Sequence, residues 1–116
     1  MASFDDLDHY RLHADLCKVL TDPKRLMLLD ALRGGERSVG ELAETIHSTL
    51  ANTSQHLAVM RSAGLVDGTR DGTTVRYRLA EPAIIAACDI VRGIVDRRLA
   101  RAATAPEPAR PVAAAH

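Results

Sequence analysis

The stretch SVGELAETIHSTLANTSQHLAVMRSAG, residues 38–64, decides the fold of this chain. Its first four residues, Ser38-Val39-Gly40-Glu41, match a capping box, in which the serine and glutamate side chains accept from each other's backbone amides at a helix start. That short helix is expected to end near His47. After a tight connection, the Thr49 hydroxyl can cap a further helix, for which Gly64 provides the stop. Two short helices joined by a tight turn form a helix-turn-helix.

The second of these helices has an inward stripe of Thr53, Leu57 and Met60 at helical spacing. In a helix-turn-helix, the second helix enters the major groove of DNA with its N-terminal residues nearest the bases. Asn and Gln side chains can bond in pairs to an adenine edge, and hydroxyl groups suit base or phosphate contacts. The predicted DNA-contacting residues are therefore Thr49, Asn52, Thr53, Ser54, Gln55 and His56. Two alternatives stay open: the polar face is merely solvated, and His56 is partly buried and hydrogen-bonded within the motif.

Two helices are expected upstream of this motif. Apolar residues recur at helical spacing over residues 5–20. Asp22-Pro23 then supplies a cap and a first-turn proline for a helix that runs to Arg33 and ends at Gly34-Gly35. Because the apolar positions of this second helix wrap around most of its surface, we expect it to be central.

A β-hairpin and a last helix are expected downstream. Residues 65–70 and 73–79 are typical of strands and flank Asp71-Gly72, the dipeptide best suited to a two-residue type I′ turn. Pro82 then opens a helix to about Ala102, and the Ala/Pro-rich residues 103–116 are expected to be disordered.

The expected fold is therefore mainly α with a β-hairpin wing: a winged helix-turn-helix of about five helices plus a two-stranded wing. Residues 1–102 would form this one DNA-binding and dimerisation domain, with the helix-turn-helix at about 38–63 and the wing at about 65–79.

The 116 residues carry no net charge, with 15 Lys and Arg against 15 Asp and Glu, but the charges are unevenly distributed. Acidic residues gather near the N-terminus, whereas three arginines lie in the expected wing: Arg70, Arg76 and Arg78. We predict that these arginines neutralise backbone phosphates of DNA. The alternative is a solvated strand face whose charges protect a sheet edge.

Features that the sequence lacks exclude several classes of protein. No apolar run approaches the roughly eighteen residues of a membrane span, and the N-terminus lacks a secretory signal, so we expect a cytoplasmic protein with no membrane contact. Cys17 and Cys88 are then expected to be reduced thiols. No catalytic constellation or glycine-rich phosphate loop is present, so an enzyme is not expected.

The first and last helices carry wide apolar faces that so small a domain has little core to cover. A homodimer through these two helices would bury them. The predicted interface consists of Leu12, Leu16, Ile84, Cys88, Val91 and Val95.

Several motifs, in this order, resemble those of the ArsR/SmtB family of transcriptional regulators. They are LTDPKRL at 20–26, SVGELA at 38–43, SQHL at 54–57, MRSAGLV at 60–66, and the wing from Asp71-Gly72 to YRL at 77–79. The resemblance covers roughly residues 8–100 and implies a dimeric winged helix-turn-helix repressor that binds a double-stranded DNA operator with two-fold symmetry. His47-Ser48 departs from the family, which usually has a glycine and an apolar residue in this turn.

The resemblance also implies where a sensing site would lie, because many members release DNA when a metal or an oxidant binds. No cysteine occurs at residues 41–43, where the resemblance would place a cysteine pair. The last-helix metal site of the family has an acid and three histidines, and the corresponding residues here are Glu81, Ala83, Ile94 and Arg97. Asp30 and Asp96 lie near the positions where the dithiol sensors have cysteines. The usual sensing sites of the family are therefore missing.

Another cluster is compatible with Zn(II), Ni(II) or Co(II). His9, His13 and Cys17 are spaced four residues apart, on one stripe of the first helix, and offer imidazole and thiolate ligands. If this helix packs on the partner's last helix, Cys88 could approach Cys17 as a further ligand or a disulfide partner. The alternative is that the cysteines pack as small hydrophobic residues.

The leading hypothesis for function is a sequence-specific DNA-binding regulator, a repressor that responds to a metal ion or a thiol-redox signal. Two alternatives are a winged-helix dimer that recruits a partner protein without specific DNA binding and a transcriptional activator without a small inducer.

Overall fold

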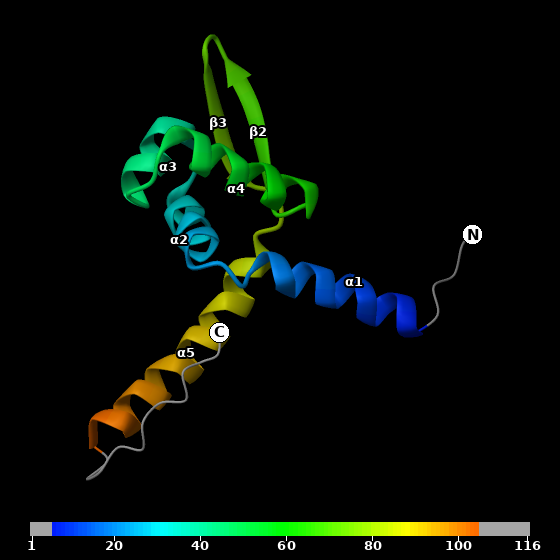
Figure 1. Cartoon of the computed structure of the whole chain (residues 1–116), viewed down its shortest axis with the longest axis vertical. Coiled ribbons are helices and arrows are strands. Elements are labelled where there is room, and N and C mark those ends of the chain that lie inside the picture. The colour runs from blue at the N-terminus through cyan, green and yellow to red at the C-terminus, as the bar shows by residue number, and fades with distance from the viewer. Residues whose placement is uncertain (1–5, 105–116) are drawn as a thin grey trace. The chain divides into compact units, whose positions relative to one another are not determined.

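The computed structural model describes residues 6–104 and confirms five helices with a β-hairpin wing (Figure 1). The elements are α1 (Asp6–Val19), α2 (Pro23–Ala31), a short 3-10 helix η1 (Leu32–Gly34), β1 (Arg37–Ser38), α3 (Val39–Thr45), α4 (Leu50–Ser62), β2 (Val66–Asp71), β3 (Thr74–Leu79) and α5 (Ala83–Thr104). The chain divides into two units, Met1–Ile85 and Ala86–His116, so the boundary lies inside α5. Of the tail predicted at 103–116, residues 103 and 104 belong to α5, and the others are outside the described residues.

The hydrophobic core of the first unit lies where α2, α3 and α4 contact one another and β2. The predicted inward stripe of α4 is confirmed, since Thr53, Leu57 and Met60 are fully buried. α2 is central, as expected, and buries Leu28 and Leu29, although its apolar residues Leu26 and Met27 are 42% and 39% exposed. The largest apolar side chains that are fully buried in this core are Leu28, Leu29, Leu32, Leu42, Ile46, Leu57, Met60, Leu65 and Val66.

The predicted N-terminal caps of α2 and α3 are formed, whereas α2 ends at Ala31 and not at Arg33 as predicted. The Asp22 carboxylate accepts from the Lys24 amide at 2.8 Å. In the capping box, the Glu41 amide donates to the Ser38 hydroxyl at 3.1 Å, and the Ser38 amide donates to the Glu41 carboxylate at 2.9 Å. These bonds satisfy amides that a helix start otherwise leaves without an acceptor, so they define where α2 and α3 begin.

The wing includes a third strand that the sequence did not predict. The sheet has the order β1-β3-β2 and is antiparallel throughout, with Arg37 opposite Tyr77 and Ser38 opposite Arg76. Ser38 adopts an extended conformation because it caps α3, and this conformation suits it to pair with β3. A strand of two residues is too short to show the alternation that identifies strands in a sequence.

The hairpin turn lies one residue later than predicted. Asp71 pairs with Thr74, so the two central residues are Gly72 and Thr73 rather than Asp71-Gly72. Gly72 has φ 66°. Thr73 does not have a positive φ, because His47 is the only described residue other than glycine that has one. A positive φ at the first central position alone is typical of a type II′ turn, in which glycine occupies that position, so type I′ was wrong.

No helix within residues 6–104 is both long enough and apolar enough to cross a membrane.

Candidate nucleic-acid interface

The turn between α3 and α4 keeps a glycine-like geometry without a glycine. His47 has φ 53°, in the left-handed region that favours glycine. The Ser48 amide donates to the Ala43 carbonyl at 3.0 Å and the His47 amide to the Glu44 carbonyl at 3.2 Å. This bond pair is a Schellman motif, which ends α3 and turns the chain toward α4. The departure from the family sequence at His47 therefore leaves the turn intact.

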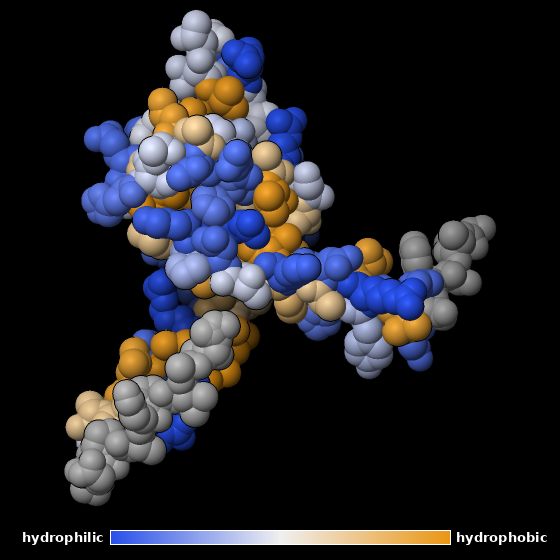
Figure 2. Space-filling view, in the orientation of Figure 1, coloured by the Kyte–Doolittle hydropathy of each residue, from blue (hydrophilic) through white to orange (hydrophobic). Residues whose placement is uncertain are grey.

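The first half of α4 presents a polar surface to solvent. The Thr49 hydroxyl accepts from the Asn52 amide at 3.0 Å and caps the helix. Asn52, Ser54 and Gln55 are exposed, and Asn52 and Gln55 are the only asparagine and glutamine in the sequence. The visible surface over α3 and α4 is mostly hydrophilic (Figure 2). These amide and hydroxyl groups can bond to base edges in a major groove.

Thr53 does not belong to this surface. It is fully buried, and its hydroxyl donates to the Thr49 carbonyl at 2.7 Å. The prediction that Thr53 contacts DNA is therefore wrong, because its place on the inward stripe leaves it no access to a base. Its hydroxyl instead supports the first turn of α4.

His56 is half-buried, as one of the sequence-based alternatives stated, but its hydrogen-bond partner belongs to α2 and lies outside the helix-turn-helix. Its Nδ1 accepts from Arg25 Nε at 3.3 Å, and Arg25 Nη1 donates to the Val19 carbonyl at the end of α1, at 3.1 Å. The neighbouring Lys24 Nζ donates to the carbonyl of Ile46, at the end of α3. Two consecutive side chains of α2 thus hold three other helices. Lys24 and Arg25 belong to the family motif at 20–26, which singled them out in the sequence. Their hydrogen-bond partners were not predicted.

The register of the sheet separates the three wing arginines that the sequence grouped together. Arg70 lies opposite Val75, whereas Arg76 lies opposite Thr69. Since opposed residues share a face of the sheet and neighbours along a strand alternate, Arg70 is on the face opposite to that of Arg76 and Arg78. Arg70, Arg76 and Arg78 were predicted to contact phosphates, but they cannot all do so from one face of the wing.

A carboxylate that sequence reasoning missed lies beside the other two arginines. Arg76 Nε is 2.9 Å from Glu36 Oε1, and Arg78 Nη1 is 3.8 Å from Glu36 Oε2. No local pattern signals this contact, because Glu36 and Arg76 are 40 residues apart in the sequence.

The capping box also sets the charge state of one side chain at the start of α3. Hydrogen bonds from the backbone and the hydroxyl of Ser38 lower the pKa of the Glu41 carboxyl below its ordinary value of 4.5, and the positive charges of Arg76 and Arg37 act in the same direction. The Glu41 carboxylate therefore stays ionised to a lower pH than a glutamate with the ordinary pKa.

Most of the predicted dimer residues are accessible on their own helices. Leu12 of α1 is 58% exposed, and Val91 and Val95 of α5 are 57% and 46% exposed, while Leu16 and Cys88 are half-buried. Hydrophobic side chains are visible at the surface of α5 (Figure 2). Ile84 is only 9% exposed and belongs to the protomer's own core, so its assignment to a dimer surface is corrected.

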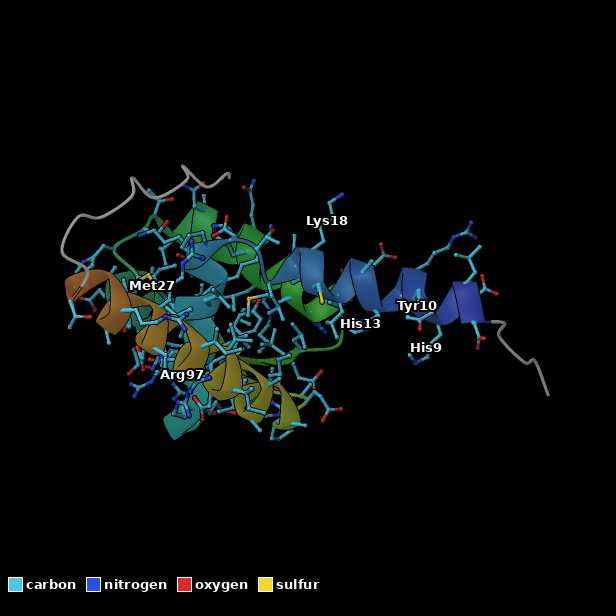
Figure 3. All side chains as sticks on the ribbon, turned by 90° about the horizontal axis from the view of Figure 1, so that it is seen from below. His9, Tyr10, His13, Lys18, Met27 and Arg97 are labelled. Carbon is cyan, nitrogen blue, oxygen red and sulfur yellow. The ribbon has the colours of Figure 1, made fainter. Side chains whose placement is uncertain are left out.

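Three of the four candidate metal ligands lie on α1, and Cys88 lies on α5. His9 and His13 are on one side of α1, with Lys18 on the other (Figure 3). Cys17 is an exposed thiol, and Cys88 is a thiol in the second unit. Among residues 6–104, no three His, Cys, Asp or Glu side chains are grouped so that they could hold a metal ion. His9, His13 and Cys17 therefore share a stripe without forming a ligand set within the described protomer.

A capped polar helix, held by α2 and flanked by a hairpin wing, defines a winged helix-turn-helix DNA-binding protein. The family described as bacterial regulatory protein, arsR family, matches residues 22–67. The HTH-type transcriptional regulator Rv0081 of Mycobacterium tuberculosis is 37% identical over 91 residues, which cover 78% of this chain and 80% of the relative. The chain therefore belongs to the ArsR family of bacterial transcriptional regulators.

Solved structures support the same assignment. The homodimeric winged helix-turn-helix domain of Mb0332 from Mycobacterium bovis matches with a TM-score of 0.72 and 32% identity, over 85% of this chain and 94% of that domain. The transcriptional repressor BigR from Xylella fastidiosa matches with a TM-score of 0.68 and 35% identity, over 81% and 96%. The chain is thus a DNA-binding transcriptional regulator, which is not an enzyme.

Proposed function

We propose that this chain is a homodimeric repressor that binds a two-fold symmetric operator in bacterial DNA, in the cytoplasm. The observation that carries the proposal is the division of α4 into two faces. Leu57 and Met60 are buried in the core, whereas Asn52 and Gln55 are exposed beyond the cap at Thr49. A rigid helix that presents amide groups near its N-terminus suits readout of adenine edges.

The dimer is supported by the apolar side chains that α5 leaves exposed. Ile90, Val91, Ile94, Val95 and Leu99 are between 46% and 69% exposed within one protomer. Apolar surface of this kind is costly in water and is typical of an interface. The Mb0332 domain is described as homodimeric, and BigR as a repressor, which favours the same state and activity for this chain.

The test begins with selection of bound duplexes from a randomised double-stranded DNA library. A dimer should enrich an inverted repeat whose half-sites lie about 10 base pairs apart, or a multiple of that spacing. In mobility shifts with the selected duplex, Asn52→Ala and Gln55→Ala should each weaken binding by about 1–3 kcal/mol and relax sequence preference. Ser62→Ala, in the last turn of the same helix, is the matched control.

Three outcomes would contradict this function. Failure to enrich any sequence would favour a module that binds a partner protein. Unchanged affinity of the Asn52 and Gln55 variants would remove α4 as the reader of bases. Increased expression of a reporter placed behind the selected operator would indicate an activator, because a repressor lowers that expression.

We further propose that the regulator responds to a metal ion or to thiol oxidation through α1. Cys17 is an exposed thiol on the same stripe as His9 and His13, and soft thiolate and imidazole ligands suit Zn(II), Ni(II) or Co(II). A complete site would need further ligands, for which Cys88 of the partner protomer is the candidate. Calorimetric titration with the three metals, and DNA affinity before and after oxidant, test the two signals. Binding weaker than micromolar for every metal, with DNA affinity indifferent to oxidant in wild type and Cys17→Ala alike, would reject both.

A further inference from the structure

Glu36 is an acidic residue beside the wing. It lies in the segment immediately before β1, and the pairing of Ser38 with Arg76 brings that segment alongside β3. Its two carboxylate oxygens are engaged by different arginines, Oε1 by Arg76 Nε at 2.9 Å and Oε2 by Arg78 Nη1 at 3.8 Å. Arg78 Nη1 also donates to Thr69 Oγ1 at 2.7 Å, so the cluster is hydrogen-bonded on both sides of β3.

The same face of the sheet carries more negative than positive charge. Asp67 lies opposite Arg78, and Asp71 lies opposite Thr74, so both aspartates share the face of the two arginines. Together with Glu36, this face has three carboxylates and two guanidinium groups. A DNA phosphate that approaches it therefore meets arginines whose charge is already compensated.

We propose that Glu36 is an internal competitor of the DNA backbone, which holds Arg76 and Arg78 in the free protein and weakens DNA binding. The inference rests on the proposed DNA-binding function. The side chains of Arg76, Arg78 and Glu36 are 36%, 46% and 43% exposed, and exposed ion pairs of this kind are weak enough to be exchanged. Phosphate is a good substitute partner because a guanidinium can donate two parallel hydrogen bonds to it.

The exchange leaves Glu36 unpaired next to the phosphate that replaced it. Repulsion between these two negative charges, and the loss of the ion pairs, both subtract from the affinity for DNA. The freed carboxylate also attracts a cation from solution, which offsets part of the counterion release on DNA binding. Glu36 is therefore expected to reduce both the affinity and its dependence on salt.

The decisive variant is Glu36→Gln, which keeps the shape of the side chain and removes its charge. On the duplex selected by the wild-type protein, its affinity should rise about threefold to tenfold at low salt. Between about 50 and 200 mM salt, the plot of log affinity against log salt should be steeper by about 1 for each wing that contacts DNA. Fluorescence anisotropy with labelled duplex gives both quantities, and circular dichroism checks that the variant is folded.

Two controls make the interpretation specific. Glu81→Gln removes the same charge from an exposed side chain that makes no ion pair with residues 6–104, and it should leave the affinity within about twofold. In an Arg76→Gln/Arg78→Gln background, Glu36→Gln should bring no gain, since the arginines it competes for are gone. A gain in that background would overturn the proposal.

The remaining outcomes separate this inference from the proposed function. If the wild-type protein binds the duplex and Glu36→Gln leaves affinity unchanged or weakens it, Glu36 is not a competitor and only supports the wing. If the wild-type protein selects no duplex at all, the proposed DNA-binding function fails instead.

Discussion

Arg25 of α2 donates a hydrogen bond to His56 of α4, from Nε to Nδ1 at 3.3 Å. The same guanidinium holds the carbonyl of Val19, so the orientation of α4 is tied to the end of α1 as well as to α2. The contact lies on the partly buried side of α4, one helical turn after the exposed Asn52.

The first prediction follows from this bond. Arg25→Met and His56→Ala should each destabilise the fold, and the double variant should show a coupling energy of about 0.5–1.5 kcal/mol in urea unfolding. The two effects should not add, because either single variant already removes the hydrogen bond that joins Arg25 and His56. Arg25→Met combined with Gln55→Ala is the control pair and should be additive. Additivity of the Arg25 and His56 variants would show that the bond contributes nothing to stability.

The second prediction concerns pH and the capping box. The pKa of Glu41 is lowered in the folded protein, chiefly by the Ser38 hydrogen bonds. Its stabilising contribution is therefore complete above the unfolded value, near 4.5, and is lost as pH falls through the lower folded value. The difference in Tm between wild type and Glu41→Gln should be largest near neutral pH and shrink in acid. Glu44→Gln, on the same helix but outside the capping box, is the control, and a constant difference for Glu41→Gln would contradict the assignment.

The third prediction tests the left-handed residue in the turn of the motif. His47 has φ 53° and an exposed side chain, so its backbone conformation matters more than its packing. His47→Gly should keep or raise the Tm, whereas His47→Val should lower stability by about 1–2 kcal/mol, because a β-branched residue tolerates this region poorly. Thermal unfolding of the two variants side by side measures the difference. Equal Tm values would mean that the turn relaxes to another conformation.

The fourth prediction addresses the apolar face of α5. Ile94 is 51% exposed in one protomer, and Ile94→Glu would place a charge in the proposed dimer interface. Light scattering after gel filtration should show a shift from dimer to monomer, with weaker DNA binding as a result. Ala103→Glu adds the same charge near the end of the helix and should leave the dimer intact. A dimeric Ile94→Glu protein would exclude this face as the interface.

The helix N-caps and the inward stripe of α4 were determined by the sequence alone, whereas the hairpin turn was predicted one residue too early. The caps at Asp22, Ser38 and Thr49, and the inward stripe of α4, follow from hydrogen bonds and periodicity within one or two helical turns. The family motifs extended this local reading to the whole order of elements. They could not show side-chain partners.

Only the tertiary structure decided how those elements bond to one another. Arg25 and His56 are 31 residues apart, and Glu36 and Arg76 are 40 apart. These pairs meet because α2 packs on α4 and because β1 joins β3, and no local pattern encodes either contact. The sequence thus determined that Thr49 caps α4 and that this helix carries Asn52 and Gln55. The packing of distant segments decided what holds the helix and which carboxylate pairs with Arg76 and Arg78.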